Sequence, residues 1–221
     1  SIDGVICGDD RFTERVLEKA RRLKVISKWG TGIDSIDREA CARHGVRVCN
    51  TPNAFTDPVA DSVLAYVLAF ARNVTAMHET MKRGTWHKVQ GHALCERTLG
   101  IIGVGNIGSA VARRARAFGM KIIGNDIREI DPVFLAEYGM TMLPLHELLR
   151  AADYISVNCD LNPTSRHLLD ARAFSQMKST AVVINCARGP IIEEPALIEA
   201  LRQGKIAGAG MDVFEEEPLP S

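Results

Sequence analysis

Residues 98–126, TLGIIGVGNIGSAVARRARAFGMKIIGND, give the clearest indication of the fold expected for this chain. Its apolar run 99–102 is typical of a buried parallel strand. Gly103, Gly105 and Gly108 follow at the first, third and sixth positions of a G-x-G-x-x-G pattern. The first glycine permits a tight turn, the second lets a pyrophosphate approach the backbone, and the third lets a helix pack closely on the strand.

The residues after the glycines complete a βαβ unit that ends in an acid. An amphipathic helix leads to a second apolar strand, 121–126, whose last residue is Asp126, 18 positions beyond Gly108. A carboxylate there accepts hydrogen bonds from the adenosine ribose and repels a 2′-phosphate. We therefore predict that the chain binds NAD, with the pyrophosphate at the helix N-terminus. Two alternatives stay open: Arg128 could attract the 2′-phosphate of NADP, and the glycines could simply turn a strand into a helix.

The order of apolar runs and helical patterns predicts two α/β domains. From residue 98 onward, strands are expected at 98–103, 121–126, 140–143, 154–158, 181–185 and 206–210. Such strict βα alternation predicts a doubly wound parallel sheet, the Rossmann fold, over residues 98–221. The first domain, residues 1–53, has the same alternation, with strands expected at 4–7, 24–27 and 46–49 and helices at 12–23 and 35–44. Three strands are few, so we expect a smaller, incomplete flavodoxin-like α/β domain.

Residues 54–97 are expected to link the two domains. Asp57 is a good N-cap and Pro58 suits the first helical turn, so a long helix is predicted from Asp57 to about Arg83. Its segment SVLAYVLAFA, residues 62–71, is apolar on nearly every face. Such a helix is buried all round or shared with a partner subunit, and we therefore predict a homodimer that forms through this segment.

Composition excludes several classes of function. Lys and Arg total 27, as do Asp and Glu, so the charge balance indicates neither nucleic-acid binding nor an anionic membrane surface. No run of 18 apolar residues could span a bilayer, and the acidic opening SIDGVICGDD is not expected to be a signal peptide. The six cysteines show no CxxC and no Cys/His spacing typical of a metal site. We expect reduced thiols, no bound metal and a cytoplasmic location.

Several motifs besides the glycine pattern are similar to those of one enzyme family. The segments INCARGPIIEEPAL, residues 184–197, and AGAGMDVFEEEP, residues 207–218, resemble the D-isomer-specific 2-hydroxyacid dehydrogenases, above all their D-3-phosphoglycerate dehydrogenase branch. The likeness extends to residues 23–37, 48–61 and 162–169. It implies NAD-dependent hydride transfer at C2 of a D-2-hydroxy acid or its 2-oxo partner, with 3-phosphoglycerate and 3-phosphohydroxypyruvate as one candidate pair. Residues 1–53 would then be part of a substrate-binding lid.

The resemblance also implies roles for residues near the ends of the later strands. Arg188 would bind the substrate carboxylate and carbonyl, because a guanidinium can fork across both groups; the alternative is an arginine that caps a strand end. Glu217, five residues beyond Asp212, would orient a catalytic histidine and raise its pKa. Asp212 itself would accept a hydrogen bond from the nicotinamide carboxamide. The cofactor-binding residues expected in all are Gly103, Gly105, Asn106, Ile107, Gly108, Asp126, Cys186 and Asp212.

In the first domain, the resemblance places substrate-binding residues after the second strand. The backbone N–H groups of Thr31 and Gly32 would hold the substrate carboxylate, which suits a glycine-containing loop. Lys28 stands where phosphoglycerate-type members carry a basic residue for the substrate phosphate. The alternative for Lys28 is a solvated side chain beside a turn.

The proton donor of the family is a histidine in a PH segment beyond the position of Glu217, and none of the six histidines here stands in that context. We expect a chain truncated at both ends; the alternative is a short natural member that binds NAD without turnover. From other classes, a co-repressor-like protein that senses NAD(H) stays open, and a methyltransferase is disfavoured by the arginine and DVF segments. Asp61 replaces a glutamate usual in the family.

Overall fold

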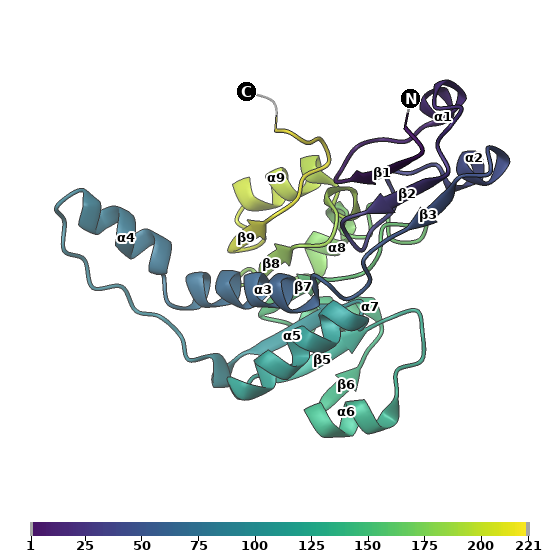
Figure 1. Ribbon diagram of the computed structural model, residues 1–221. Helices are drawn as coiled ribbons and strands as arrows, with labels where there is room; N and C mark the ends of the chain where they lie inside the picture. Colours follow the sequence, from purple (N-terminus) through teal and green to yellow (C-terminus); the bar gives the residue numbers. More distant parts are fainter. Residues whose placement is uncertain (1, 220–221) are drawn as a thin grey trace. The chain divides into compact units, whose positions relative to one another are not determined.

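The computed structural model describes residues 2–219 and contains two compact units, Ser1–Thr56 and Asp57–Ser221. Each unit is built around its own parallel sheet, of three and six strands respectively (Figure 1). We call them the N-terminal unit and the C-terminal unit. The segment predicted to link two domains, residues 54–97, therefore groups mostly with the second unit.

The N-terminal unit has the strand order β1-β2-β3, formed by β1 (Gly4–Cys7), β2 (Val25–Lys28) and β3 (Arg47–Cys49). Its helices, α1 (Glu14–Lys19) and α2 (Arg38–Arg43), are shorter than the predicted spans 12–23 and 35–44. The N-cap of α2 is Asp37, whose carboxylate accepts from the N–H of Ala40 at 2.8 Å and so fixes where this helix begins. A small buried cluster that includes Leu17 and Ile26 forms the core.

The C-terminal unit contains the doubly wound parallel sheet that the sequence predicts. The strand order is β6-β5-β4-β7-β8-β9, and every pairing is parallel. The strands are β4 (Thr98–Ile102), β5 (Lys121–Asn125), β6 (Met140–Met142), β7 (Tyr154–Val157), β8 (Val182–Asn185) and β9 (Gly208–Met211). The order reverses between β4 and β7, so the loops after these strands meet where such sheets bind ligands.

Alternating side chains of the sheet build a core on each of its two faces. In β4, Leu99 and Ile101 belong to a cluster that packs against α3 (Thr56–Ala71) and α5 (Asn106–Ala117), whereas Ile102 belongs to the cluster on the opposite face. That second cluster packs against α7 (Leu145–Ala151), α8 (Ala171–Gln176) and α9 (Glu194–Arg202). The remaining elements are α4 (Val74–Lys82), α6 (Pro132–Tyr138) and the single 3₁₀ turns η1 (Leu94–Glu96) and η2 (Gly189–Ile191).

The single helix predicted from Asp57 to about Arg83 is wrong. The structure has α3 and α4 instead, with a bend of 63° between them. Asn73 takes a left-handed conformation at φ 53°, which asparagine tolerates, and its side-chain amide donates to the carbonyl of Gln90 at 3.0 Å. Within residues 2–219, no single helix is long and apolar enough to cross a membrane, and only the bent pair α3 and α4 passes that test jointly.

Candidate functional site

The three glycines after β4 have different surroundings. Gly103 takes φ 88°, and a Cβ there would lie 2.6 Å from the Cα of Cys159. A Cβ at Gly108 would overlap the carbonyl oxygen of Gly103. At Gly105, the N-cap of α5, the nearest atom to a built Cβ is Nη2 of Arg128 at 3.5 Å. The first and third glycines are therefore required by packing, whereas the second leaves room over the turn for a pyrophosphate at the helix N-terminus.

Asp126 follows β5 and its carboxylate is tied to the glycine turn. It accepts from the N–H of Val104 at 2.7 Å and from the N–H of Arg128 at 2.8 Å. The guanidinium of Arg128 also contacts it, with Nε at 3.1 Å and Nη2 at 3.2 Å, and the side chain of Asp126 is only 5% exposed. Burial alone would raise the pKa of Asp126, but the hydrogen bonds from Arg128 and Val104 outweigh burial and hold this pKa below its ordinary value.

The ion pair with Arg128 is a feature that the sequence did not reveal. The sequence suggests Arg128 only as an attractor of a 2′-phosphate, whereas in the structure its guanidinium lies on the carboxylate expected to bind the ribose. Ribose hydroxyls that bind Asp126 would therefore share the carboxylate with this guanidinium or displace it. Asp126 directly follows β5, its role at the ribose stays a prediction, and its ion pair with Arg128 is new.

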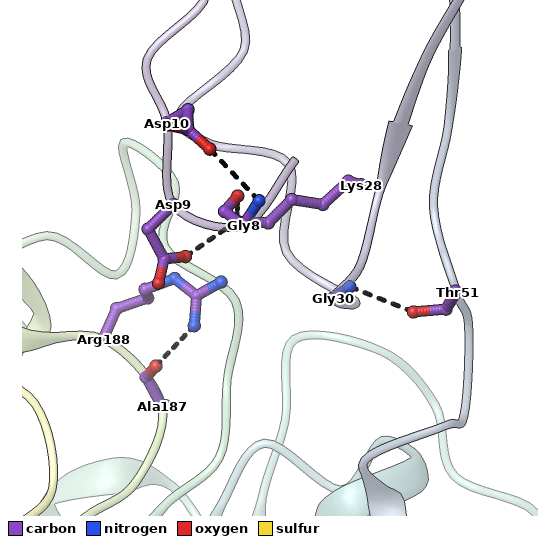
Figure 2. A network of polar contacts seen from close by, with 8 residues as sticks. All are labelled: Gly8, Asp9, Asp10, Lys28, Gly30, Thr51, Ala187 and Arg188. Atoms are coloured by element: carbon purple, nitrogen blue, oxygen red, sulfur yellow. Dashed lines mark hydrogen bonds and ion pairs between the residues drawn. The ribbon is translucent and has the colours of Figure 1, made fainter. Parts of the chain in front are cut away.

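Arg188 lies in the loop after β8, and a buried asparagine shapes this loop. The amide of Asn185, the last residue of β8, donates to the carbonyl of Arg188 at 2.9 Å and accepts from the N–H of Ala187 at 3.0 Å. Asn185 is fully buried. Figure 2 shows the guanidinium of Arg188, whose Nη1 donates to the carbonyl of Ala187 at 2.8 Å. Asn185 was missed in the sequence, where a polar residue ending the apolar run of β8 was the available signal.

The loop of Arg188 packs directly on the segment after β9. A Cβ at Gly189 would overlap the backbone of Phe214, so the two backbones approach as closely as glycine allows. The N–H of Asp212 donates to the carbonyl of Asn185 at 3.0 Å. Arg188 and Asp212 are thus placed on neighbouring loops of the same sheet edge.

The three acids at positions 215 to 217 are distinguished by their contacts. The carboxylate of Glu217 accepts from the N–H of Phe214 at 2.7 Å. Glu215 instead contacts Nε2 of His167 at 2.5 Å, and its N–H donates to the carboxylate of Glu194 at 2.6 Å. The structure therefore brings a histidine to Glu215, which no sequence signal selected. The expected role of Glu217 in orienting a histidine stays a prediction.

Two partly or fully buried cysteines of the C-terminal unit, Cys159 and Cys186, are unreactive. Burial raises the pKa of Cys159 to about 11, and burial together with the charge of Asp212 raises the pKa of Cys186 to about 12. Thiols with such pKa values stay protonated at neutral pH and are poor nucleophiles. Cys186 is therefore suited to line a cofactor site but not to attack a substrate. No group of three or more His, Cys, Asp or Glu side chains among the described residues could hold a metal ion.

The candidate residues of the N-terminal unit lie at the carboxyl end of β2. The side chain of Asn50 donates to the carbonyl of Thr31 at 2.8 Å, and the N–H of Gly30 donates to the hydroxyl of Thr51 at 3.0 Å. The loop that holds Thr31 and Gly32 is thus shaped by the residues after β3.

Lys28 points away from solvent. Only 4% of its side chain is exposed, and its ammonium donates to the carbonyl of Gly8 and to the carboxylate of Asp9, the latter at 2.7 Å (Figure 2). The open alternative for Lys28, a solvated side chain, is therefore wrong.

Comparisons with known proteins identify the family that this chain resembles. A sequence model of the D-isomer specific 2-hydroxyacid dehydrogenase family, NAD binding domain, matches residues 64–221. The chain is 43% identical over 218 residues to a D-3-phosphoglycerate dehydrogenase of Methanocaldococcus jannaschii, covering 97% of this chain and 41% of that relative. It is 38% identical to a glyoxylate reductase of Korarchaeum cryptofilum, covering 96% of this chain and 65% of that relative. The chain thus spans about two fifths of the first relative and under two thirds of the second.

A solved structure supports the same assignment. The D-lactate dehydrogenase of Aquifex aeolicus, complexed with NAD and lactic acid, superposes with a TM-score of 0.92 at 32% identity. The match covers 98% of this chain and 66% of that one. The matched family domain binds NAD, as Asp126 and the glycines predict.

Proposed function

Because the chain belongs to the D-isomer-specific 2-hydroxyacid dehydrogenase family, we propose that it forms the core of an NAD-dependent oxidoreductase acting at C2 of a D-2-hydroxy acid or its 2-oxo partner. One observation carries the proposal. The glycine turn after β4, Asp126 after β5 and Arg188 after β8 follow parallel strands of one sheet at their carboxyl ends. Ligands of doubly wound sheets bind at this edge, where the strand order reverses.

The residues around the glycine turn fit NAD. When bound, the nicotinamide ring supplies or accepts the hydride. The backbone at Gly105, which no other backbone atom crowds, suits a pyrophosphate, Asp126 would hold the adenosine ribose, and Asp212 would accept from the carboxamide. Asn106, Ile107 and the protonated Cys186 would line the same site.

Arg188 would bind the substrate and stabilise the charge that develops during reduction. Its guanidinium can fork across the carboxylate and carbonyl oxygens of a 2-oxo acid. The carbonyl oxygen gains negative charge as hydride reaches C2, and a fixed cation nearby lowers that barrier. Asn185 would keep the loop in position for this role. Reduction also needs a proton at the carbonyl oxygen, and we assign this step to none of the histidines in the chain.

NADH oxidation by the natural full-length protein tests the proposal, with glyoxylate, pyruvate, hydroxypyruvate and 3-phosphohydroxypyruvate as acceptors. We expect turnover with at least one of them. Arg188→Lys should keep the affinity for NADH but lower kcat/KM by about 100-fold or more, because a fixed charge on the developing oxyanion is lost. Arg202→Lys, a surface change in the last turn of α9, is the matched control. Tight NADH binding without reduction of any 2-oxo acid would contradict the proposal.

One observation favours a second candidate, a protein whose interactions are controlled by NAD(H). Helix α4 buries none of its residues, and Val74, Met81 and Trp86 in and after it are exposed. Such a surface suits assembly. This candidate predicts that NADH and NAD shift the oligomeric state while turnover stays negligible in the full-length protein, whereas an enzyme keeps its oligomeric state and turns over.

A further inference from the structure

The inference concerns the substrate class and rests on the proposed function. The relatives include both D-3-phosphoglycerate dehydrogenases and glyoxylate reductases at comparable identity, so similarity alone leaves a phosphorylated and an unphosphorylated substrate open. The N-terminal unit offers a physical criterion, because Lys28, which is buried, lies at the carboxyl end of β2.

The ammonium of Lys28 is already used within the unit. It donates to the carbonyl of Gly8 and, at 2.7 Å, to the carboxylate of Asp9, which neutralises its charge. Figure 2 shows the side chain running from β2 toward the loop of Gly8 and Asp9. A lysine that binds a phosphate needs its charge directed at the ligand, and here the charge is directed at its own protein.

The stem of Lys28 is fixed as well. A Cβ at Gly30 would lie 3.0 Å from Cε and 3.6 Å from Cγ of Lys28, so the stem packs against this glycine. Gly30 begins the loop that carries Thr31 and Gly32. Lys28 thus ties the loop after β1 to the loop after β2, and turning it toward solvent would break the ion pair and remove the packing under Gly30.

The neighbouring charges disfavour a second anion. The segments after β1 and β2 carry the acids Asp9, Asp10, Asp34 and Asp37, against the cations Arg11 and Lys28, the last residue of β2. Asp10 accepts from the N–H of Gly8 at 3.2 Å, which keeps its charge in the same loop as Asp9. A phosphate ester carries close to two negative charges at neutral pH and is normally met by several cations.

We propose that Lys28 is a positioning residue rather than a phosphate ligand, and that the substrate is a short 2-oxo acid without a phosphate group. Hydroxypyruvate and 3-phosphohydroxypyruvate differ only in the phosphate group. The ratio of their kcat/KM values in the full-length protein therefore measures the preference for or against this group. The expected ratio favours hydroxypyruvate by at least about tenfold, or 1.4 kcal/mol.

Two variants in the loop after β1 distinguish the effect of the ion pair with Lys28 from the effect of the loop's total negative charge. Asp9→Asn removes the negative charge that neutralises Lys28 and leaves its ammonium on the carbonyl of Gly8, so the ratio should shift toward 3-phosphohydroxypyruvate. Asp10→Asn also removes one negative charge from this loop but keeps the ion pair between Lys28 and Asp9, and it should shift the ratio by less. Lys28→Met keeps most of the stem and should lower kcat/KM for both substrates alike, leaving the ratio unchanged. A preference of the wild type for 3-phosphohydroxypyruvate that Lys28→Met abolishes would overturn the inference.

A binding measurement keeps this test independent of turnover. If NADH binds and no 2-oxo acid is reduced, the proposed function fails, and the thermal shift caused by 3-phosphohydroxypyruvate decides the inference. A shift of the wild type that Lys28→Met loses would overturn it. An equal thermal shift, or none, in both the wild type and Lys28→Met would support the inference that Lys28 is not a phosphate ligand.

Discussion

Gly105 differs from Gly103 and Gly108 in that a Cβ there would clash with no backbone atom and would meet only Nη2 of Arg128, at 3.5 Å. Its φ of −83° is also accessible to alanine. If the glycines only turned a strand into a helix, a methyl group at Gly105 would be harmless. If the space holds a pyrophosphate, the same methyl group would block the ligand.

Gly105→Ala should therefore leave the free energy of unfolding close to that of the wild type and weaken NADH binding by about tenfold or more, equivalent to 1.4 kcal/mol. Gly108→Ala is the contrasting change, since its Cβ would overlap the carbonyl oxygen of Gly103 and destabilise the fold. Chemical denaturation and NADH fluorescence titration measure the two effects. Unchanged NADH affinity in a folded Gly105→Ala protein would favour the purely structural role of the turn.

Asp126 makes stability depend on pH. Its pKa in the folded protein lies below the ordinary value despite burial, because Arg128 and Val104 donate to the carboxylate. Its ionised form therefore adds stability above an unfolded pKa of about 4, and this contribution is lost as the pH falls through the folded pKa. The free energy of unfolding of the wild type should fall more steeply below about pH 5 than that of Asp126→Asn. Parallel pH profiles of the two proteins would show that the carboxylate is not stabilised by folding.

At the residue scale, the sequence predicted where site residues lie in the fold better than it predicted their hydrogen-bond and ion-pair partners. Asp126 and the glycines follow from spacing, since each position in a βαβ unit has one geometric role. The partners depend on residues brought together by folding, as with Arg128 on Asp126, Asp9 on Lys28 and His167 on Glu215. No count along the chain selects Glu215 for a histidine 48 positions away.

At the scale of elements, the first two turns of α3 are tied to α5 by one arginine. Arg114 donates from Nε to Asp61 at 2.6 Å and from Nη2 to Asp57 at 3.0 Å. This gives a physical role to Asp61, for which the sequence offered none. Both carboxylates are largely exposed, so each pair is expected to contribute modestly.

A double-mutant cycle on Asp61→Ala and Arg114→Met should give a coupling energy of about 0.5 kcal/mol in low salt, and less as salt screens the pair. Asp57→Ala with Arg114→Met is the matched cycle on the other carboxylate of the same arginine. Urea unfolding at two salt concentrations measures both. A coupling that does not decrease with salt would point to packing of the arginine stem rather than to charge.

The strands were predicted within about two residues because apolar runs between turn signals identify buried parallel strands. The break between α3 and α4 was missed for the opposite reason. Residues 56–82 have a continuous helical pattern, and the bend depends on Asn73 and its bond to Gln90, 17 positions away. Local sequence patterns thus specify helices and strands, whereas a break within a helix can depend on hydrogen bonds to residues distant in the sequence.

At the scale of the whole molecule, α3 and α4 have opposite environments. Five residues of α3 are buried in the core of the C-terminal unit, whereas α4 and the residues after it project from that unit (Figure 1). Helices that bury nothing in their own chain gain little from tertiary packing. The homodimer stays a prediction, and we propose that its contact surface is α4 with Met81 and Trp86 rather than the apolar stretch of α3.

Sedimentation of the full-length protein at micromolar concentration should give a dimer, and Met81→Glu with Trp86→Glu should give a monomer, because two charges would be buried in an apolar contact. Val133→Glu is the matched control, since Val133 on α6 is 71% exposed and lies outside this segment. If the double variant and the control both remain dimeric, the dimer forms through another surface. A wild-type monomer would contradict the predicted homodimer.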